Sequence, residues 1–157
     1  MKTCGIIAEY NPFHQGHRYH LSKAKEASGC ETLVVITSGL FSQRGLPSLM
    51  DPAAKTRLAL ENGADLVLEL PACYTLQSAR YFSRYAIQSL SALGIDSLCF
   101  GSETNDIPYL ESLSLQKKDL KTDPSTSLNH NTDLNLQPND ILAYHYIQDC
   151  RTHHIEP

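Results

Sequence analysis

The stretch that decides the fold is GIIAEYNPFHQGH, residues 5–17. It starts inside a short, continuous apolar run, Cys4–Ala8, which predicts a β-strand buried on both faces. Asn11-Pro12 then predicts a turn, and His17–Ser28 predicts a helix that ends at Gly29. A buried strand, a turn and a helix in this order are typical of the first unit of a parallel α/β sheet.

The same alternation continues along the rest of the chain. Three further apolar runs rich in β-branched residues predict strands at Thr32–Thr37, Asp65–Leu70 and Ser97–Phe100. Helices are predicted between them at Pro52–Asn62, behind an N-cap at Asp51, and at Ser78–Leu93, before Gly94. Because parallel strands joined by helices take right-handed crossovers, we expect an α/β fold with a doubly wound parallel sheet.

The chain changes in character after Glu103. Ile107–Leu115 predicts a short helix, and Pro138-Asn139-Asp140 opens a last helix, Ile141–Cys150. Between them lies a stretch rich in Asn, Asp, Ser and Thr, which predicts a linker or a long surface loop. We therefore expect three parts: one domain over residues 1–115, a linker over 116–137, and the start of a C-terminal helical segment over 138–157.

The composition predicts a globular protein of the cytoplasm. Hydrophobic residues make up 41% of the chain and charged residues 19%, which is enough for a buried core. No apolar run approaches the roughly 20 residues of a membrane-spanning helix, and Glu9 comes before any signal-peptide core. Five widely spaced cysteines without a CxxC pair favour free thiols over disulfides or a thiolate zinc site.

The charge distribution gives no basic footprint for nucleic acid. Residues 1–100 hold nine Lys/Arg against eight Asp/Glu, whereas residues 101–157 hold four against nine. Any contact with RNA must therefore be local, and near the expected crevice we expect it from Arg18, Arg44 and Lys55.

The HxGH pattern, His14 to His17, lies where the first strand gives way to a helix. In a parallel sheet this edge faces the ligand crevice, and a helix N-terminus there offers free N–H groups to a polyphosphate. His14 and His17 can donate hydrogen bonds to phosphate oxygens, and Gly16 would let a nucleotide approach the backbone. Two ordinary surface histidines remain an alternative. A metal site with His20 is disfavoured, because residues three apart rotate around the helix and do not converge.

Several motifs together resemble the bacterial tRNA(Met) cytidine acetate ligase family, within the HxGH nucleotidylyltransferase superfamily. The matching pieces are GIIAEYNPFHQGHRYHL (5–21), SGLFSQRG (38–45), ALENGADLVLELP (59–71), QSARYF (77–82), ALGIDSLCFGSE (92–103) and PNDIL (138–142). The resemblance implies a Rossmann-like sheet, with residues 1–115 as the nucleotide-binding domain, and ATP and Mg²⁺ as cofactors. The sequence differs from the family at Leu40, where Asn is usual.

The resemblance also implies which residues form the ATP site. These are Ile7, Ala8, Glu9, Tyr10, Asn11, Pro12, Phe13, His14, Gln15, Gly16, His17, Arg18, Tyr19 and His20, together with Gly101 and Asn139. We expect His14, His17 and Arg44 to be catalytic. The residues do not predict a protein-held metal.

Other side chains near this edge leave two interpretations open. Arg44 and Gln43 would meet a phosphate or the second substrate, or else lie on a solvated loop. Glu103 would bind ribose or a metal-bound water, or be a loop carboxylate, and Asn139 is expected at a helix N-cap. Glu69 is expected to be buried with a structural partner. The aromatic residues Tyr81, Phe82 and Tyr85 are expected in the core.

The resemblance implies a ligase that activates acetate as acetyl-adenylate and acetylates N4 of the wobble cytidine of elongator tRNA(Met). Nucleotidyl transfer to a small phosphorylated acceptor and a non-catalytic nucleotide-binding remnant are the alternatives. The family continues into an arginine-bearing motif and a tRNA-holding region, whereas this sequence ends at Pro157. We therefore expect a fragment or a short form, with weak or absent tRNA binding. The sequence sets no oligomeric state.

Overall fold

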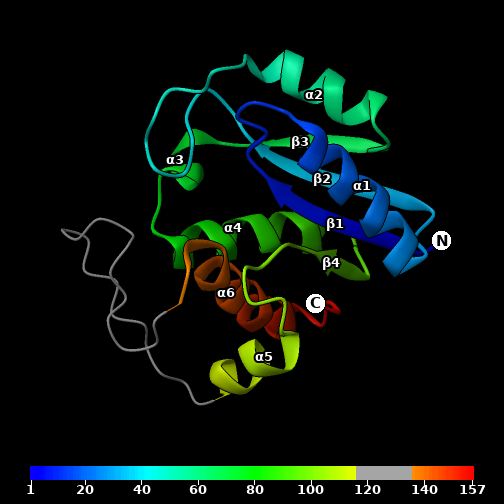
Figure 1. Cartoon of the computed structure of the whole chain (residues 1–157), viewed down its shortest axis with the longest axis vertical. Helices are drawn as coiled ribbons and strands as arrows, with labels where there is room; N and C mark the ends of the chain where they lie inside the picture. The colour runs from blue at the N-terminus through cyan, green and yellow to red at the C-terminus, as the bar shows by residue number, and fades with distance from the viewer. Residues whose placement is uncertain (116–135) are drawn as a thin grey trace.

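The computed structural model describes residues 1–115 and 136–157. It contains a four-stranded parallel sheet in the order β3-β2-β1-β4 (Figure 1). The strands are β1 (Thr3–Ala8), β2 (Thr32–Ser38), β3 (Leu66–Leu70) and β4 (Ser97–Cys99). β1 lies inside the sheet and pairs in parallel with both β2 and β4. All four predicted strands are confirmed to within one residue at each end, and so is the doubly wound α/β fold.

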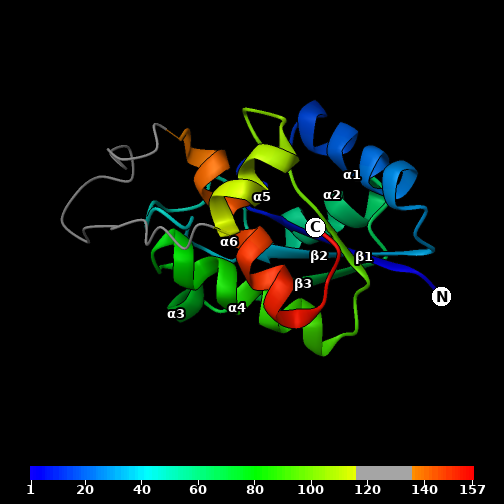
Figure 2. The same ribbon diagram turned by 90° about the horizontal axis from the view of Figure 1, so that it is seen from below.

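Helices cover both faces of the sheet (Figures 1 and 2). They are α1 (Gln15–Ser28), α2 (Pro52–Glu61), α3 (Ala72–Thr75), α4 (Ala79–Ala92), α5 (Ile107–Leu115) and α6 (Pro138–His153). α1 and α2 pack on one face, whereas α4 and α6 pack on the other. No helix in the described part of the chain has the length and apolar character needed to cross a membrane.

The two inner strands have a hydrophobic core on each side. Ile6 and Val35 point toward α1 and α2, whereas their neighbours Ile7 and Ile36 point toward α4 and α6. Successive side chains of a strand alternate between faces, so a strand covered on both sides must be apolar at nearly every position. This explains why the runs in β1 and β2 are continuous.

β3 differs because it is an edge strand. It pairs only with β2, Leu66 is 40% exposed, and the Glu69 side chain is exposed. The predictions that this strand is buried on both faces and that Glu69 is buried are therefore wrong. The physical reason is the strand order, because helices cover the edge of this sheet less completely than its centre.

The aromatic residues of α4 are not all in the core. Phe82 is buried, and Tyr85 is partly buried with its ring 4.3 Å from that of Tyr74. Tyr81 is 45% exposed, with the Arg84 guanidinium 5.9 Å from its ring centre, so its expected core position is wrong. Tyr81 precedes the apolar stripe of α4 by one residue, which rotates it toward solvent.

The helix ends follow their capping residues. Asp51 caps α2 by accepting the Ala54 N–H at 2.9 Å, and Gly29 ends α1 in the left-handed conformation with φ 60°. α6, however, begins at Pro138, where a missing N–H costs nothing, and Gln137 flanks it. Asn139 is therefore the second residue of the helix, and the prediction that it is the N-cap is wrong.

α6 contributes directly to the core of the molecule. It packs against α4 and α5, and Tyr146 and Cys150 are buried with the side chains of α4. Arg151 reaches α5, where it donates to Ser114 Oγ at 2.6 Å. The linker expected over 116–137 lies outside the described residues except for its last two positions.

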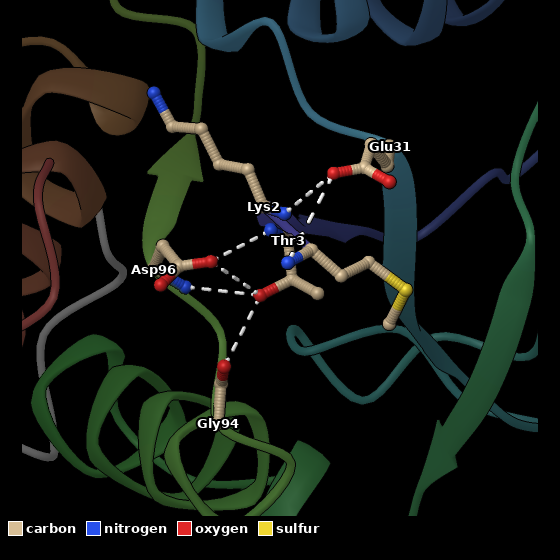
Figure 3. Close-up of polar contacts among 6 residues, drawn as sticks. Lys2, Thr3, Glu31, Gly94 and Asp96 are labelled. Atoms are coloured by element: carbon tan, nitrogen blue, oxygen red, sulfur yellow. Dashed lines mark hydrogen bonds and ion pairs between the residues drawn. The ribbon is translucent and has the colours of Figure 1, made fainter.

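Polar contacts close the amino edge of the sheet (Figure 3). Asp96 accepts the Thr3 N–H at 2.7 Å and the Thr3 hydroxyl at 2.9 Å, while the Lys2 N–H donates to Glu31 at 3.3 Å. These bonds from Thr3 hold the pKa of Asp96 below its usual range. Hydrogen bonds thus hold together the amino ends of the strands. The candidate site lies at the opposite edge of the sheet, at the carboxyl ends of the strands.

Candidate functional site

A cavity of about 600 Å³ lies at the carboxyl ends of β1 and β4. Its walls come from the β1–α1 turn, the segment after β2, the start of α4, the end of β4 and the start of α6. This is the crevice where ligands bind in doubly wound sheets. Nine of the predicted site residues line it: Ile7, Ala8, Glu9, Asn11, His17, His20, Arg44, Gly101 and Asn139.

The other predicted residues of the β1–α1 segment lie outside the cavity wall. They are Tyr10, Pro12, Phe13, His14, Gln15, Gly16, Arg18 and Tyr19. Tyr10 is 1% exposed, and its ring lies 5.0 Å from the rings of both Phe13 and His17. Tyr19 is 65% exposed on the outer face of α1. Tyr10 and Phe13 thus support the His17 ring from behind.

His14 and His17 form a reciprocal cap at the N-terminus of α1. His14 Nδ1 accepts the Gly16 N–H at 3.1 Å, and His17 Nδ1 accepts the His14 N–H at 3.3 Å. The two rings stack, with centroids 3.8 Å apart. A nitrogen that accepts a hydrogen bond carries a lone pair, so each neutral ring holds its proton on Nε2. Both histidines therefore present an Nε2–H donor.

Burial keeps His17 and His20 neutral. It lowers the pKa of His17 to about 4, and the neighbouring His14 and His20 lower it further in the same direction. Burial also lowers the pKa of His20. At neutral pH His17 thus offers an anion a neutral N–H donor beside the helix N-terminus, and no imidazolium charge.

Gly16 is needed for the histidine cap itself. A Cβ at this position would lie 2.9 Å from His14 Cε1 and 3.1 Å from His14 Nδ1. Any side chain would therefore push the His14 ring away from the N–H that it accepts. The HxGH spacing follows from this geometry, because the first histidine is the N-cap, the glycine is the second helical residue and the second histidine is the third.

A hairpin between β2 and α2, residues 39–50, forms a second wall. The Ser42 N–H donates to Leu46 O and the Ser48 N–H to Leu40 O, both at 2.8 Å. Glu9 accepts the Gln43 N–H, and this contact ties the hairpin to the end of β1. Arg44 lines the cavity, and its guanidinium has no hydrogen bond or ion pair with residues 1–115 or 136–157.

A pair of carboxylates joins the two remaining walls. Glu103 accepts the Asn139 N–H at 3.2 Å and the Asp140 N–H at 2.9 Å. Asp140 in turn accepts the Glu103 N–H at 2.9 Å and the Thr104 N–H at 3.1 Å. Glu103 is thus a cap of α6 and not a free loop carboxylate. This clasp, Glu103 with Asp140, holds Gly101 and Asn139 on adjoining walls of the cavity.

Comparison with known proteins assigns the chain to a family. A family model described as HIGH Nucleotidyl Transferase matches residues 1–156. The chain belongs to the HIGH nucleotidyl transferase family. A Clostridium kluyveri tRNA(Met) cytidine acetate ligase is 53% identical over 111 residues, which cover 70% of this chain and 27% of the relative. A Bacillus subtilis protein of the same name is 39% identical over 175 residues, covering 97% of this chain and 42% of the relative.

Solved structures of the same group share the fold. The Thermotoga maritima TmcAL bound with α-thio ATP has a TM-score of 0.86 and 32% sequence identity, covering 99% of this chain and 45% of that one. Its apo form gives a TM-score of 0.85. This nucleotidyl transferase chain thus spans less than half the length of these relatives.

Lys55 corrects one sequence-based expectation about RNA. It was expected to be an exposed contact, but its side chain is 0% exposed. The expectation is wrong because Lys55 lies on the inner face of α2, against the base of the hairpin. Lysines are almost never fully buried, so composition alone predicted the opposite. Arg18 and Arg44 remain as exposed cations of the three.

Sequence reasoning missed much of the cavity lining. The unassigned lining residues are Ser42, Leu46, Ala79, Phe82, Phe100, Ser102, Pro138, Ile141, Leu142 and Tyr146. Phe100 and Ser102 flank Gly101 at the end of β4, so the crevice rule already pointed to them. The α4 and α6 residues could not be found this way, because only the packing of these helices brings them to the edge.

The buried residue His145 gives a first prediction, which concerns how folding stability changes at acidic pH. Burial lowers the pKa of His145 to about 4 despite an opposing hydrogen bond with Gln148, and its Nε2 has no partner among the described residues. A histidine whose pKa is lower in the folded than in the unfolded protein binds more protons when the protein unfolds. Its contribution to folding stability is therefore complete above the unfolded-state pKa and is lost as the pH falls toward the folded-state pKa. Stability should therefore fall between about pH 6.5 and pH 4.

The measurement is urea unfolding at neutral and at acidic pH. His145→Gln should remove about 2.5 kcal/mol of the difference between pH 7.5 and pH 4.5. His154→Gln, at the exposed end of α6, is the control and should leave the difference unchanged. Equal pH sensitivity in wild type and His145→Gln would contradict the assignment.

Proposed function

We propose that the chain provides the catalytic domain of an ATP-dependent ligase. The ligase activates acetate as acetyl-adenylate and transfers the acetyl group to N4 of the wobble cytidine of elongator tRNA(Met). The observation that carries this proposal is the pair of Nε2–H donors, His14 and His17, at the helix N-terminus beside the cavity. The names of the relatives and the ATP analogue bound to the similar structure support it.

In the first step, an acetate oxygen attacks the α-phosphorus of ATP. The bond to the bridging oxygen breaks, and pyrophosphate leaves with both electrons of that bond. His14, His17 and the positive end of the α1 dipole stabilise the charge that grows on the phosphates. Arg44 binds the incoming carboxylate or the pyrophosphate with its fixed fork of donors. This step needs no nucleophile from the protein.

In the second step, N4 of the cytidine attacks the acetyl carbonyl. AMP leaves, and the amine proton passes to solvent. Positioning of the two reactants supplies most of the rate, because the acyl-adenylate is already an activated donor. The adenosine part would lie between Gly101 and Asn139. The phosphates would lie near the lining residues Ile7, Ala8, Glu9, Asn11, His17 and His20, with His14 beside them.

The site also fits Mg²⁺. Glu9 is the single carboxylate among the described lining residues, and Mg²⁺ is usually held by one or two carboxylates together with substrate phosphates. Glu9 would hold the ion on that side of the cavity, and the bound ion would neutralise phosphate charge. The protein side chains alone offer no group of three or more His, Cys, Asp or Glu ligands within the described ranges.

We propose that the reaction takes place in the cytoplasm. All five cysteines are free thiols, as expected in a reducing compartment, and tRNA is found there. Because Lys55 is buried and few cations surround the cavity, this domain alone would hold tRNA weakly.

A second candidate is nucleotidyl transfer to a small phosphorylated acceptor. The description of the matching family model favours it, since the same histidines would stabilise the same leaving pyrophosphate. The two reactions differ in the nucleophile at the α-phosphorus, which is a carboxylate in one and a phosphate in the other.

One assay separates these functions. The protein is incubated with ATP, Mg²⁺ and labelled acetate, with and without tRNA(Met), and released pyrophosphate and labelled adenylate are measured. Acetate-dependent pyrophosphate release is the expected result. Release only with a phosphorylated acceptor supports the second candidate, and ATP binding without release in either case contradicts both.

A further inference from the structure

The β2–α2 hairpin, residues 39–50, is fixed at several points. The hairpin has its own cross-strand bonds and is also bonded to Asn11. Asn11 Oδ1 accepts the Leu49 N–H at 2.6 Å and the Ser48 hydroxyl at 3.2 Å. The Gln43 amide nitrogen donates to Gln77 O at 2.6 Å, next to α4. A segment held to three neighbouring elements is a rigid arm, and Arg44 projects from it at the cavity.

Lys55 closes the base of this arm. Its Nζ donates to Gly39 O at 2.9 Å and Ser38 O at 3.1 Å, and lies 3.4 Å from Ser38 Oγ. Ser38 ends β2, and Lys55 lies in the first turns of α2, so one side chain joins the entry and the exit of the hairpin. The ammonium is fully buried and so must have partners of this kind.

The charges around Lys55 explain why a cation is tolerated there. Burial lowers the pKa of Lys55, and the nearby carboxylates of Glu9 and Glu69 oppose this shift by favouring its charged form. The Glu69 carboxylate lies against Gly39, and a side chain at that position would have to displace it. Lys55 thus donates to two backbone carbonyls and is influenced electrostatically by two carboxylates. One of these, Glu9, lines the cavity and also accepts the Gln43 N–H of the hairpin.

We propose that Lys55 is a positioning residue, which fixes the hairpin so that Arg44 faces the phosphates of a nucleotide in the cavity. The proposal rests on the nucleotide site described under the proposed function, and its effect on ligands passes through Arg44. Without the ammonium, the Ser38 and Gly39 carbonyls lose their partner and the base of the hairpin opens.

Hydrogen exchange tests the positioning directly and needs no activity. In Lys55→Met, the amides of Ser42, Gly45, Leu46 and Ser48 should exchange at least about tenfold faster. The amides of β1 should keep their protection. Arg57→Met is the matched control, since Arg57 is an exposed cation two residues along the same helix. Unchanged exchange in the hairpin, or an equal rise across the whole sheet, would overturn the proposal.

Ligand binding tests whether Lys55 affects nucleotide affinity through Arg44. Lys55→Met should weaken ATP binding about tenfold and leave adenosine binding unchanged, because the loss concerns phosphate contacts only. In an Arg44→Ala background, Lys55→Met should have no further effect on ATP affinity. Additive losses, or equal losses for ATP and adenosine, would overturn the proposal. Wild-type protein that binds no ATP would instead contradict the proposed function, while the exchange experiment would still judge Lys55.

Discussion

His14→Asn should lower the rate of pyrophosphate release by about 100- to 1000-fold while leaving the fold as stable as wild type. Asparagine is among the best N-cap residues, and its Oδ1 can accept the Gly16 N–H that His14 Nδ1 accepts now. It has no donor at the position of Nε2. The variant therefore keeps the helix cap and loses only the hydrogen bond to the developing charge, which is stronger in the transition state than in the ground state.

Two further variants serve as comparisons for His14→Asn. His14→Ala should show the same kinetic loss and also lose about 1 kcal/mol of stability, because it removes the cap as well. His154→Asn, far from the cavity, should be neutral in both measurements. Single-turnover pyrophosphate release, ATP titration and urea unfolding are measured for each. ATP affinity that falls as much as turnover would show that His14 serves binding and not the transition state.

Gly101→Leu should abolish nucleotide binding without harming the fold. A Cβ at this position meets nothing within 4 Å, and the backbone is not in the left-handed region, so the protein itself does not require glycine there. Gly101 nevertheless lines the cavity, and a leucine side chain would occupy the space between the walls. We expect ATP affinity to fall at least about 100-fold, or about 2.7 kcal/mol.

A size series makes this result specific. Gly101→Ala should weaken ATP binding less than Gly101→Leu, and both proteins should unfold within about 0.5 kcal/mol of wild type. Calorimetric titration with ATP and urea unfolding provide the two measurements. Wild-type ATP affinity in Gly101→Leu would place the nucleotide elsewhere in the cavity.

The strands and most helix ends were predictable from the sequence because each has a local cause. The doubly covered strands must be apolar at nearly every position, and Asp51 and Gly29 perform capping roles that depend on a few neighbouring residues. The location of the cavity was predictable too, because the carboxyl edge of a parallel sheet follows from topology alone.

The remaining features depend on contacts between distant parts of the chain. The exposure of Glu69 follows from strand order, and the burial of Lys55 follows from where α2 rests on the hairpin. Asn139 was misplaced because a proline can occupy the first helical position, and the N–H groups that donate to Glu103 show that α6 has already begun there. Periodicity along a sequence carries no information on such pairings.

The Glu103–Asp140 clasp has a consequence for how this protein can vary. Four backbone N–H groups and two carboxylates fix the distance between the end of β4 and the start of α6, whatever the length of chain that joins them. Lengthening the chain between these two points adds only about 0.6 kcal/mol of closure entropy for each doubling of its length. Insertions, deletions or a grafted reporter peptide between Leu115 and Pro138 should therefore be tolerated, and evolution is free to change that connection while the cavity keeps its shape.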